Sequence, residues 1–494
     1  MRNKRINNFE PKLVLETFME YCKIPHPSKH EEGVRQFCLD FLTKNNIEFT
    51  HASDKLGNTV INIPASKDFE HKPIVGLQAH LDMVAVKESG MAHDFLTDAI
   101  DVYEENGWLK ANGTTLGADN GIGVALILAY VVEQRKTHGP LELIFTVQEE
   151  NGIQGMAAFK IPLNAKYLIN IDGEHEQNNA IALGCLGGNA HSIRLQPKLE
   201  KIKPNSVVLE LSIDGLLGGH SGIHATEIRL NAIKTCFQIL EKVSQKYHLN
   251  LISVDGGSSY NSIATYCSAV FSVEKEDSAQ IQKEINEESK SIISAFKDIE
   301  KNANYTLKKI NAEYSQCFDK ASTNKIIKAI SLMQSNIIIY NKVHEILELA
   351  CNVGLIKWDE IKKELDFRVQ VRGLNADRME CFVSFYRSQL ENLGFITKKV
   401  MGYYPWEPKI QSKTNLTHLL QVADDATKKL FNKPAIFFVV PGGLEMSYVS
   451  ERYPQMELMA LSTNILDAHA VTERVQISSI NDCYSLLKEV LKNI

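Results

Sequence analysis

Short apolar segments alternate with helix-like segments along the first part of the chain. Residues 73–79, 143–147 and 166–171 form short, mostly apolar runs, which is typical of buried strands. Helical periodicity marks residues 10–21, and residues 124–132 form an apolar helix. Strands that alternate with helices predict an α/β fold.

Polar residues follow each of the three predicted strands. His80 and Asp82 follow the first strand, Glu149 and Glu150 the second, and Asp172 the third. Open α/β sheets bind their ligands at the carboxyl ends of the strands. Carboxylates together with an imidazole suit zinc or manganese, and no cysteine lies beside these positions. The pattern therefore predicts a metal site at this edge of the sheet.

The adjacent acids Glu149 and Glu150 are predicted to have different roles. Neighbouring residues on an extended chain point in opposite directions, so one acid would bind a cation and the other would face a substrate. His80 and Asp82 are two residues apart and would share a face, where the carboxylate fixes the tautomer of the imidazole. Taken alone, the acid pair has a simpler interpretation as a solvated loop, and a His-x-Asp tripeptide also arises by chance.

Asp119 lies in a glycine-rich segment, residues 113–123, that leads into the apolar helix. A carboxylate at a helix N-terminus is stabilised by free N–H groups, so a simple helix cap and a ligand role are equally open. A phosphate-binding loop is disfavoured because no Gly-Lys-Ser/Thr follows. Earlier in the chain, Ser28 is predicted to cap a helix, with Glu31 completing a capping box.

The length of 494 residues exceeds that of a single core and indicates two or more domains. In the second part of the chain, residues 206–213 are predicted to form a strand. Residues 282–297 and 302–309 are predicted to form polar helices with solvated faces.

Composition narrows the class of protein. The net charge of -6 and the pI near 6.2 do not favour a nucleic-acid partner or an anionic membrane surface. The nine cysteines are scattered without a Cys-x-x-Cys pair, which argues for a reducing compartment. Residues 1–13 lack the apolar core of a signal peptide, and the longest apolar stretch, residues 123–132, is far short of the roughly 20 residues that span a bilayer. We therefore expect a cytoplasmic protein.

Several of these segments resemble one known family. The similarity covers residues 24–32, 78–84, 114–123 and 170–172, and reappears at residues 215–222, 442–445, 469 and 473–475. Together the motifs are similar to the aminoacyl-histidine dipeptidase branch of the di-zinc M20 metallopeptidases, also called peptidase D or cytosol non-specific dipeptidase. The resemblance implies a mixed-sheet α/β catalytic domain at residues 1–187 and 400–494. An inserted α+β lid domain, residues 188–399, would interrupt it.

The resemblance also implies two zinc ions per chain, with manganese or cobalt as possible substitutes. The residues that match the family's ligands are His80, Asp119, Glu150, Asp172 and His469. Asp119 would bridge the two ions. His80 and Asp172 would hold one ion, while Glu150 and His469 would hold the other.

Catalytic roles follow from the same resemblance. Glu149 would act as general base toward a water that bridges the ions, and Asp82 would orient His80. His220 lies in a Gly-His-Ser-Gly segment of the lid and would stabilise the oxyanion. A structural histidine in a glycine turn is the alternative for His220.

Three further residues are candidates for substrate binding. Asn261 and Arg372 would hold the carboxylate of the substrate, and Glu445 would meet its free amine. Arg368 is a rival for the role of Arg372, and a surface arginine is the plain alternative for both.

The expected function is hydrolysis of the peptide bond of unblocked dipeptides, Xaa-His and broader, by a homodimer formed through the lid. An M20-type amidohydrolase that acts on N-acyl amino acids is one alternative, and a catalytically silent binding protein on the same fold is another. A general base at Glu149 beside a full ligand set argues against the silent protein. Two departures from the family pattern, at residues 443–447 and 467–471, keep the metal ligands and concern the preferred substrate.

Overall fold

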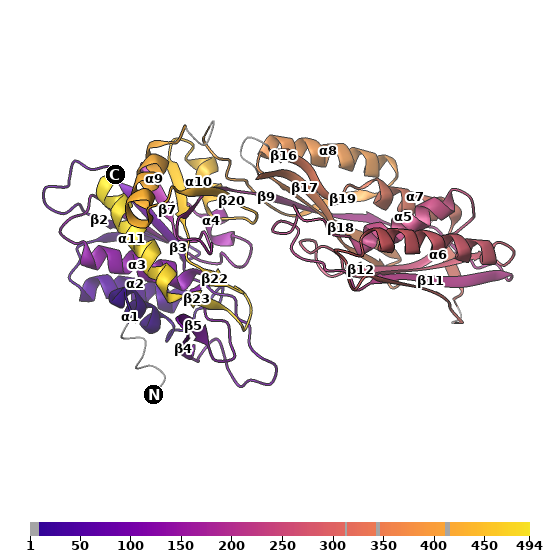
Figure 1. Cartoon of the computed structure of the whole chain (residues 1–494), viewed down its shortest axis with the longest axis horizontal. Helices are drawn as coiled ribbons and strands as arrows, with labels where there is room; N and C mark the ends of the chain where they lie inside the picture. The colour runs from indigo at the N-terminus through magenta and orange to yellow at the C-terminus, as the bar shows by residue number, and fades with distance from the viewer. Residues whose placement is uncertain (1–8, 312–313, 342–345, 411–414) are drawn as a thin grey trace. The chain divides into compact units, whose positions relative to one another are not determined.

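The computed structural model describes residues 9–311, 314–341, 346–410 and 415–494. The chain divides into two compact units, each with its own hydrophobic core (Figure 1). The first unit contains Met1–Cys185 and Trp406–Ile494, and the second contains Leu186–Pro405. The predicted domain boundaries, at residues 187/188 and 399/400, lie a few residues from these.

The first unit is built on an eight-stranded mixed sheet with the strand order β1-β2-β6-β3-β7-β21-β8-β20. The strands are β1 Thr50–Ser53, β2 Thr59–Ile63, β3 Val75–His80, β6 Leu141–Thr146, β7 Tyr167–Asn170, β8 Ala180–Cys185, β20 Ile436–Val440 and β21 Glu457–Leu461. β3 runs parallel to both β6 and β7, and β7 runs parallel to β21. The carboxyl ends of these four strands therefore meet at one edge of the sheet.

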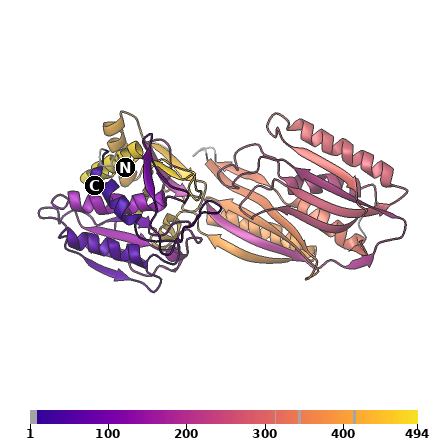
Figure 2. The same ribbon diagram turned by 90° about the horizontal axis from the view of Figure 1, so that it is seen from below.

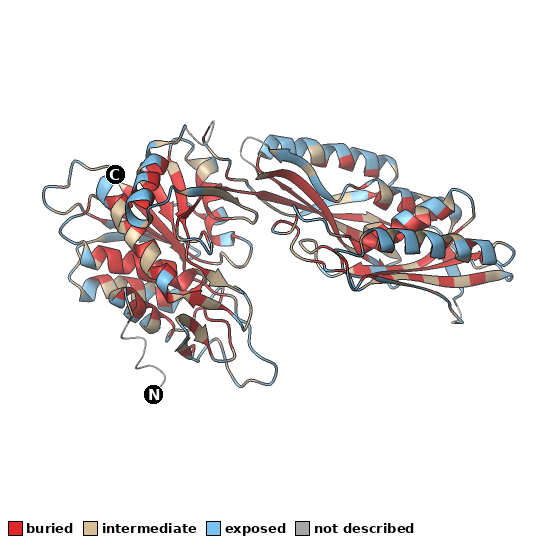
Figure 3. Ribbon diagram, in the orientation of Figure 1, coloured by how far each residue is buried: buried red, intermediate tan, exposed pale blue. Residues whose placement is uncertain are grey.

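Helices surround this sheet, and the five longest of them share its core (Figure 1). The helices are α1 Lys12–Tyr21, α2 Glu32–Lys44, α3 Ala118–Glu133, α4 Gln154–Ala158, α9 His418–Phe431, α10 Met446–Arg452 and α11 Ile477–Asn493. A four-stranded sheet completes the unit, with β4 Val102–Glu105, β5 Trp108–Ala111, β22 Ile465–Leu466 and β23 Arg474–Gln476. Almost every residue of α3 is buried, which explains why the sequence of this helix is apolar on all sides (Figure 3).

The second unit contains a nine-stranded sheet. Eight of its strands follow the order β14-β11-β13-β12-β17-β18-β9-β19, and the ninth, β16, pairs with β17. Its strands are β9 Gly187–Leu195, β11 Ser206–Asp214, β12 Asn250–Gly257, β13 Cys267–Glu274, β14 Asn304–Lys309, β16 Asn336–Asn341, β17 Ile346–Asp359, β18 Glu364–Gly373 and β19 Ile396–Tyr403. β10 Leu199–Lys201 and β15 Gln316–Phe318 form a separate two-stranded sheet, and β15 lies against β12. Figures 1 and 2 show these strands from two sides.

The helices described in the second unit pack on its sheet through one shared core. They are α5 Ala232–Ser244, α6 Ser278–Ala295, α7 Lys320–Leu332 and α8 Ala376–Asn392. Along β11 every second residue is buried, as expected where one face of an antiparallel sheet meets the core and the other is more open. The core side chains Phe237 and Phe271 are fully buried, on α5 and β13.

The predicted α/β fold class is confirmed, and the segments predicted as strands and helices around the predicted metal site form β3, β6, β7, α1 and α3. The prediction of a helix at residues 302–309 is wrong. That segment forms β14, an edge strand that pairs with β11. Tyr305 and Leu307 alternate with exposed polar residues and pack against the core, a period of two that the charged composition obscured.

The predicted capping box is also wrong. Helix α2 begins at Glu32, and its N-cap Glu31 makes no capping hydrogen bond with its side chain. Ser28 instead donates to Asp82, and Glu31 accepts from the backbone nitrogens of Lys29 and Gln148. Neither side chain caps the helix, because each bonds a residue that is distant in sequence: Ser28 bonds Asp82, and Glu31 bonds Gln148.

Within the residues that the structure describes, no helix combines the length and apolar character that a membrane crossing requires.

Candidate active site

The predicted metal ligands come from separate elements of the first unit. His80 is the last residue of β3, and Asp172 follows β7 by two residues. Glu150 lies in the turn after β6, and Asp119 lies in the first turn of α3. His469 lies in the loop between β22 and β23. The structure brings all five side chains to the edge where the parallel strands end.

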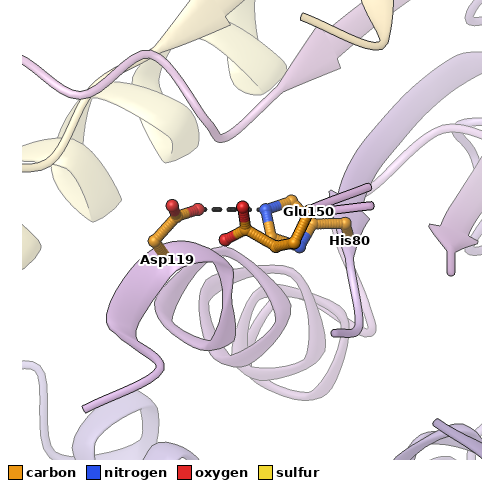
Figure 4. A group of neighbouring side chains, drawn as sticks. All are labelled: His80, Asp119 and Glu150. Carbon is orange, nitrogen blue, oxygen red and sulfur yellow. Dashed lines mark hydrogen bonds and ion pairs between the residues drawn. The ribbon is translucent and has the colours of Figure 1, made fainter. Parts of the chain in front are cut away.

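Asp119 is the centre of this cluster. Its Oδ1 lies 2.9 Å from Nε2 of His80, and its Oδ2 lies 3.1 Å from Nε2 of His469. Each imidazole has a second acid nearby: Oδ1 of Asp172 lies 3.8 Å from His80, and Oε2 of Glu150 lies 2.9 Å from His469. Two groups of ligand atoms therefore form, one around each oxygen of Asp119. Figure 4 shows His80, Asp119 and Glu150 converging.

Asp82 has a larger role in this edge than the sequence predicted. Nδ1 of His80 lies 3.0 Å from the backbone oxygen of Asp82 and 3.5 Å from its carboxylate, which leaves Nε2 directed at Asp119. The Asp82 carboxylate also accepts from the backbone nitrogens of Glu149 and Glu150, at 2.9 and 3.2 Å. It therefore orients the histidine and holds the turn that carries both glutamates.

The prediction that an extended chain points Glu149 and Glu150 in opposite directions is wrong. Neither residue is on an extended strand, because β6 ends at Thr146 and Gln148 adopts a left-handed conformation with φ 53°. The turn itself sets their directions. Glu150 pairs with His469, whereas no such pair is found for Glu149 in the described structure.

Burial and the two imidazoles control the charges at this edge. Burial opposes ionisation of Asp119, but hydrogen bonds from His469 and His80 outweigh it and lower the pKa of Asp119. The contacts with Asp119 and then Glu150 raise the pKa of His469 to about 11. Burial raises the pKa values of Glu150 and Asp172 to about 7. Asp119 is therefore ionised at neutral pH, whereas Glu150 and Asp172 are only partly ionised.

Cations fit this cluster. The buried Oε1 of Glu150 has no hydrogen-bond partner. Across the described chain, no lysine or arginine forms an ion pair with Asp119, Glu150 or Asp172. One ligand atom from each of His80, Asp119 and Glu150 lies within 4.8 Å of the others. Imidazole nitrogens with carboxylate oxygens are a donor set suited to zinc or manganese, so this edge is a candidate metal site.

Glu445 is enclosed near this edge. It is 0% exposed, and its Oε2 accepts from the side chains of Gln78 and Thr146 on β3 and β6. Burial raises the pKa of Glu445 to about 8. Its predicted contact with a substrate amine stays a prediction, because the described partners of its carboxylate belong to the sheet.

The other predicted site residues lie in the second unit, where they form a cluster of their own. Arg372 is buried, and its guanidinium lies 2.9 Å from Nε2 of His220, 2.8 Å from the hydroxyl of Tyr403 and 3.3 Å from that of Ser221. Burial and then the charge of Arg372 lower the pKa of His220 to about 4. The imidazole is therefore neutral near pH 7.

Neutral His220 has one N–H and no acceptor for it among the described residues. Nδ1 faces the backbone nitrogens of Gly222 and Ile223, at 3.4 and 3.2 Å, and Nε2 faces Arg372. All of these neighbours are donors, so whichever nitrogen carries the proton has no partner in this cluster. An acceptor supplied by a ligand would satisfy it.

The cluster also separates the two arginine candidates. Arg368 is half-buried and pairs with Asp366, at 3.2 Å, whereas Arg372 is buried and contacts His220. The backbone oxygen of Asn261 accepts from the nitrogen of Ser221, which brings the third candidate beside them.

Sequence reasoning missed two residues that support the ligands. Asn120 donates to Oδ1 of Asp172 at 2.5 Å, and Glu473 binds the backbone of the Asp119 turn. Asn120 is adjacent to Asp119 in the glycine-rich segment, and Glu473 follows His469 by four residues. Their closeness in sequence to predicted ligands could have indicated that both residues support the site. It could not have shown which backbone groups Glu473 contacts.

The sequence matches Peptidase family M20/M25/M40 over residues 76–493. The chain therefore belongs to this family, which confirms the resemblance and the predicted peptidase class. It is 30% identical to the cytosol non-specific dipeptidase of Escherichia coli (strain K12) over 497 aligned residues, an alignment that covers 99% of each protein.

Solved structures agree with this assignment. Aminoacylhistidine dipeptidase from Vibrio alginolyticus is 28% identical and gives a TM-score of 0.88, with 100% of this chain and 98% of that chain covered. Aminopeptidase PepT from Bacillus cereus ATCC 10987 is 14% identical with a TM-score of 0.55, covers 98% of both chains, and shows the fold alone.

The charge of Arg372 is expected to control the protonation of His220. Arg372→Met should raise the pKa of His220 above its value of about 4 but not to 6.5, because burial is the larger cause. The ring signals of His220 in NMR spectra recorded across pH would measure this, with Arg368→Met as the matched control that leaves the titration unchanged. An unshifted His220 titration in Arg372→Met would contradict the electrostatic coupling.

This shift also has a stability consequence. The pKa of His220 is lower in the folded protein than its ordinary 6.5, so its neutral state stabilises the fold above pH 6.5. That contribution is lost as the pH falls from 6.5 through about 4, and Arg372→Met should reduce the loss.

Proposed function

We propose that this protein is a di-zinc dipeptidase that hydrolyses the peptide bond of unblocked dipeptides, Xaa-His and broader. The observation that carries the proposal is the position of Asp119, whose two carboxylate oxygens lie against two imidazoles, each with its own second acid. The relatives from E. coli and V. alginolyticus are named as dipeptidases, which supports the substrate class.

In this proposal Asp119 would be shared by the two ions. His80 and Asp172 would hold one ion, and Glu150 and His469 would hold the other, with manganese or cobalt as possible substitutes for zinc. When bound, the ions polarise the scissile carbonyl and make water nucleophilic near neutral pH. The cluster supports this division because the ligand atoms already form two groups around Asp119.

Glu149 is the proposed general base. Its carboxylate accepts a proton from the attacking water and delivers it to the leaving amine. The turn held by Asp82 carries Glu149 next to Glu150, so the base lies beside the ligands without being one of them. Burial raises the pKa of Glu149 well above its ordinary value, and cations nearby favour its ionised form.

His220 is proposed to donate its N–H to the carbonyl oxygen as negative charge develops there. The neutral ring with an unsatisfied N–H supports this role, because a donor aimed at a developing oxyanion needs a free hydrogen. The role requires the second unit to act as a lid over the site of the first.

The remaining assignments complete the proposal. Asn261 and Arg372 hold the carboxylate of the dipeptide, and Glu445 meets its amine. The protein forms a homodimer through its second unit and works in the cytoplasm, in line with the name of its E. coli relative.

The proposal is tested first with paired substrates. Purified protein should contain close to two metal ions per chain and should hydrolyse free dipeptides but not their N-acetylated counterparts. A chelator should abolish hydrolysis, and zinc, manganese or cobalt should restore it, because the nucleophile depends on the ions. Hydrolysis of the acetylated substrates alone would instead identify an amidohydrolase, and full activity without metal would refute the site.

Substitution of the adjacent glutamates separates proton transfer from metal binding. Glu149→Gln should keep both ions and lower kcat roughly 10²- to 10⁴-fold, because the amide accepts no proton. Glu150→Gln should weaken the ion that it shares with His469, with partial rescue by excess metal. Metal content and kcat of the two variants, measured side by side, decide this. Loss of metal from Glu149→Gln together with a fully loaded, inactive Glu150→Gln would show that the roles are reversed.

His220→Ala should lower kcat roughly a hundred- to thousand-fold with unchanged metal content, as loss of an oxyanion donor does. His248→Ala, which removes a histidine of the same unit outside the cluster, should leave kcat unchanged. Steady-state kinetics and metal analysis provide the comparison. If His220→Ala retains the kcat of the wild type, His220 has only a structural role.

A further inference from the structure

The buried carboxylate of Glu473 accepts hydrogen bonds from four successive backbone N–H groups. Its Oε2 lies 2.7 Å from the nitrogen of Leu116 and 3.1 Å from that of Gly117. Its Oε1 lies 2.8 Å from the nitrogen of Ala118 and 3.4 Å from that of Asp119. Glu473 is 3% exposed, so these bonds replace water around the charge.

The N–H groups of these four residues have no partner within their own helix. The N-cap of α3 is Gly117, which has a left-handed φ of 71° and no side-chain cap. Asp119 departs from helical geometry, with φ -84° and ψ 102°. The first N–H groups of a helix lack partners within the helix, and a carboxylate is favourable there. Glu473 supplies this cap from a part of the chain that is distant in sequence.

The backbone of Glu473 is also bonded to the His469 loop. The loop turns through positive φ at Asp467 and His469, and the backbone nitrogen of Glu473 donates to the oxygen of Ala470 at 3.0 Å. After Glu473 the chain enters β23, which pairs with β5. One side chain thus links the loop of His469 to the turn of Asp119, the two residues whose side chains meet at 3.1 Å.

We propose that Glu473 is a positioning residue for the metal pair, which holds the backbone of Asp119 in register with the His469 loop before an ion binds. This inference rests on the proposed two-metal site. A hydroxyl or amide cap would satisfy fewer of the four donors. A second carboxylate beside Asp119 also adds repulsion, which nearby cations would offset.

A general contribution to folding is the rival explanation, and Glu142 provides a matched control. Glu142 is 2% exposed and lies on β6, toward the end of the strand opposite to Glu149. Its carboxylate accepts from the backbone nitrogens of Asn164 and Ala165, at 2.9 and 3.0 Å. It is a buried carboxylate bonded to main-chain N–H groups of the same unit, but it does not meet the ligand turns.

The experiment compares wild-type protein, Glu473→Gln and Glu142→Gln after removal of metal. Each is titrated with zinc in competition with a chelating indicator, and the melting temperature is measured with and without zinc. Glu473→Gln should bind both ions about ten- to a hundredfold more weakly, the usual effect of removing a partner of a ligand. Both ions should be affected because Asp119 serves both. Glu142→Gln should lose melting temperature only.

Wild-type affinity in Glu473→Gln, or an equal loss of affinity in Glu142→Gln, would overturn the inference. If Glu473→Gln does not fold, Glu473→Asp replaces it; this variant keeps the charge but shortens the reach, and wild-type affinity there would likewise overturn the inference. Affinity needs no substrate. A wild-type protein that binds two ions but hydrolyses no dipeptide would therefore defeat the proposed function alone.

Discussion

Repulsion among buried carboxylates governs the edge of the first sheet. Asp119, Glu150 and Asp172 gather where β3, β6 and β7 end, and the only ion-pair partners found for them in the described chain are two imidazoles. Charges in such an environment interact strongly: burial first, and then the charge of Asp119, raise the pKa values of Glu150 and Asp172. The fold therefore has to hold these acids together against their mutual repulsion.

Backbone hydrogen bonds do much of this holding. Asp82 binds the nitrogens of Glu149 and Glu150, Glu31 binds that of Gln148, and Glu473 binds the Asp119 turn. In each case a carboxylate is stabilised by main-chain N–H groups and not by a lysine or arginine. Lysine or arginine side chains at these positions would neutralise the carboxylates and weaken their attraction for a metal ion. Neutral N–H donors stabilise the carboxylates without this loss.

The sequence predicted the parts of the fold that follow from local patterns. Apolar runs predicted β3, β6 and β7, and the polar residues after them predicted His80 and Asp172. The end of a strand can be predicted because apolar residues give way to polar ones within a few positions of the sequence. It did not reveal contacts between distant segments. Ser28 was predicted to cap a helix but donates to Asp82 instead. Glu149 and Glu150 were predicted to lie on an extended chain, but Gln148 before them has a left-handed conformation. β14 was missed because its charged residues hide a period of two.

The way in which the chain leaves and returns to the first unit has a consequence for how such proteins diversify. Cys185 and Trp406 exchange two backbone hydrogen bonds of 3.0 Å, so the ends of the intervening segment are already paired. A turn of a few residues could join them, and the entropy of closing a longer insert rises only slowly with its length. The whole second unit is therefore an insertion whose two ends lie together. Its length could change without rebuilding the sheet that carries the candidate ligands, because the chain leaves and re-enters the first unit at one paired point.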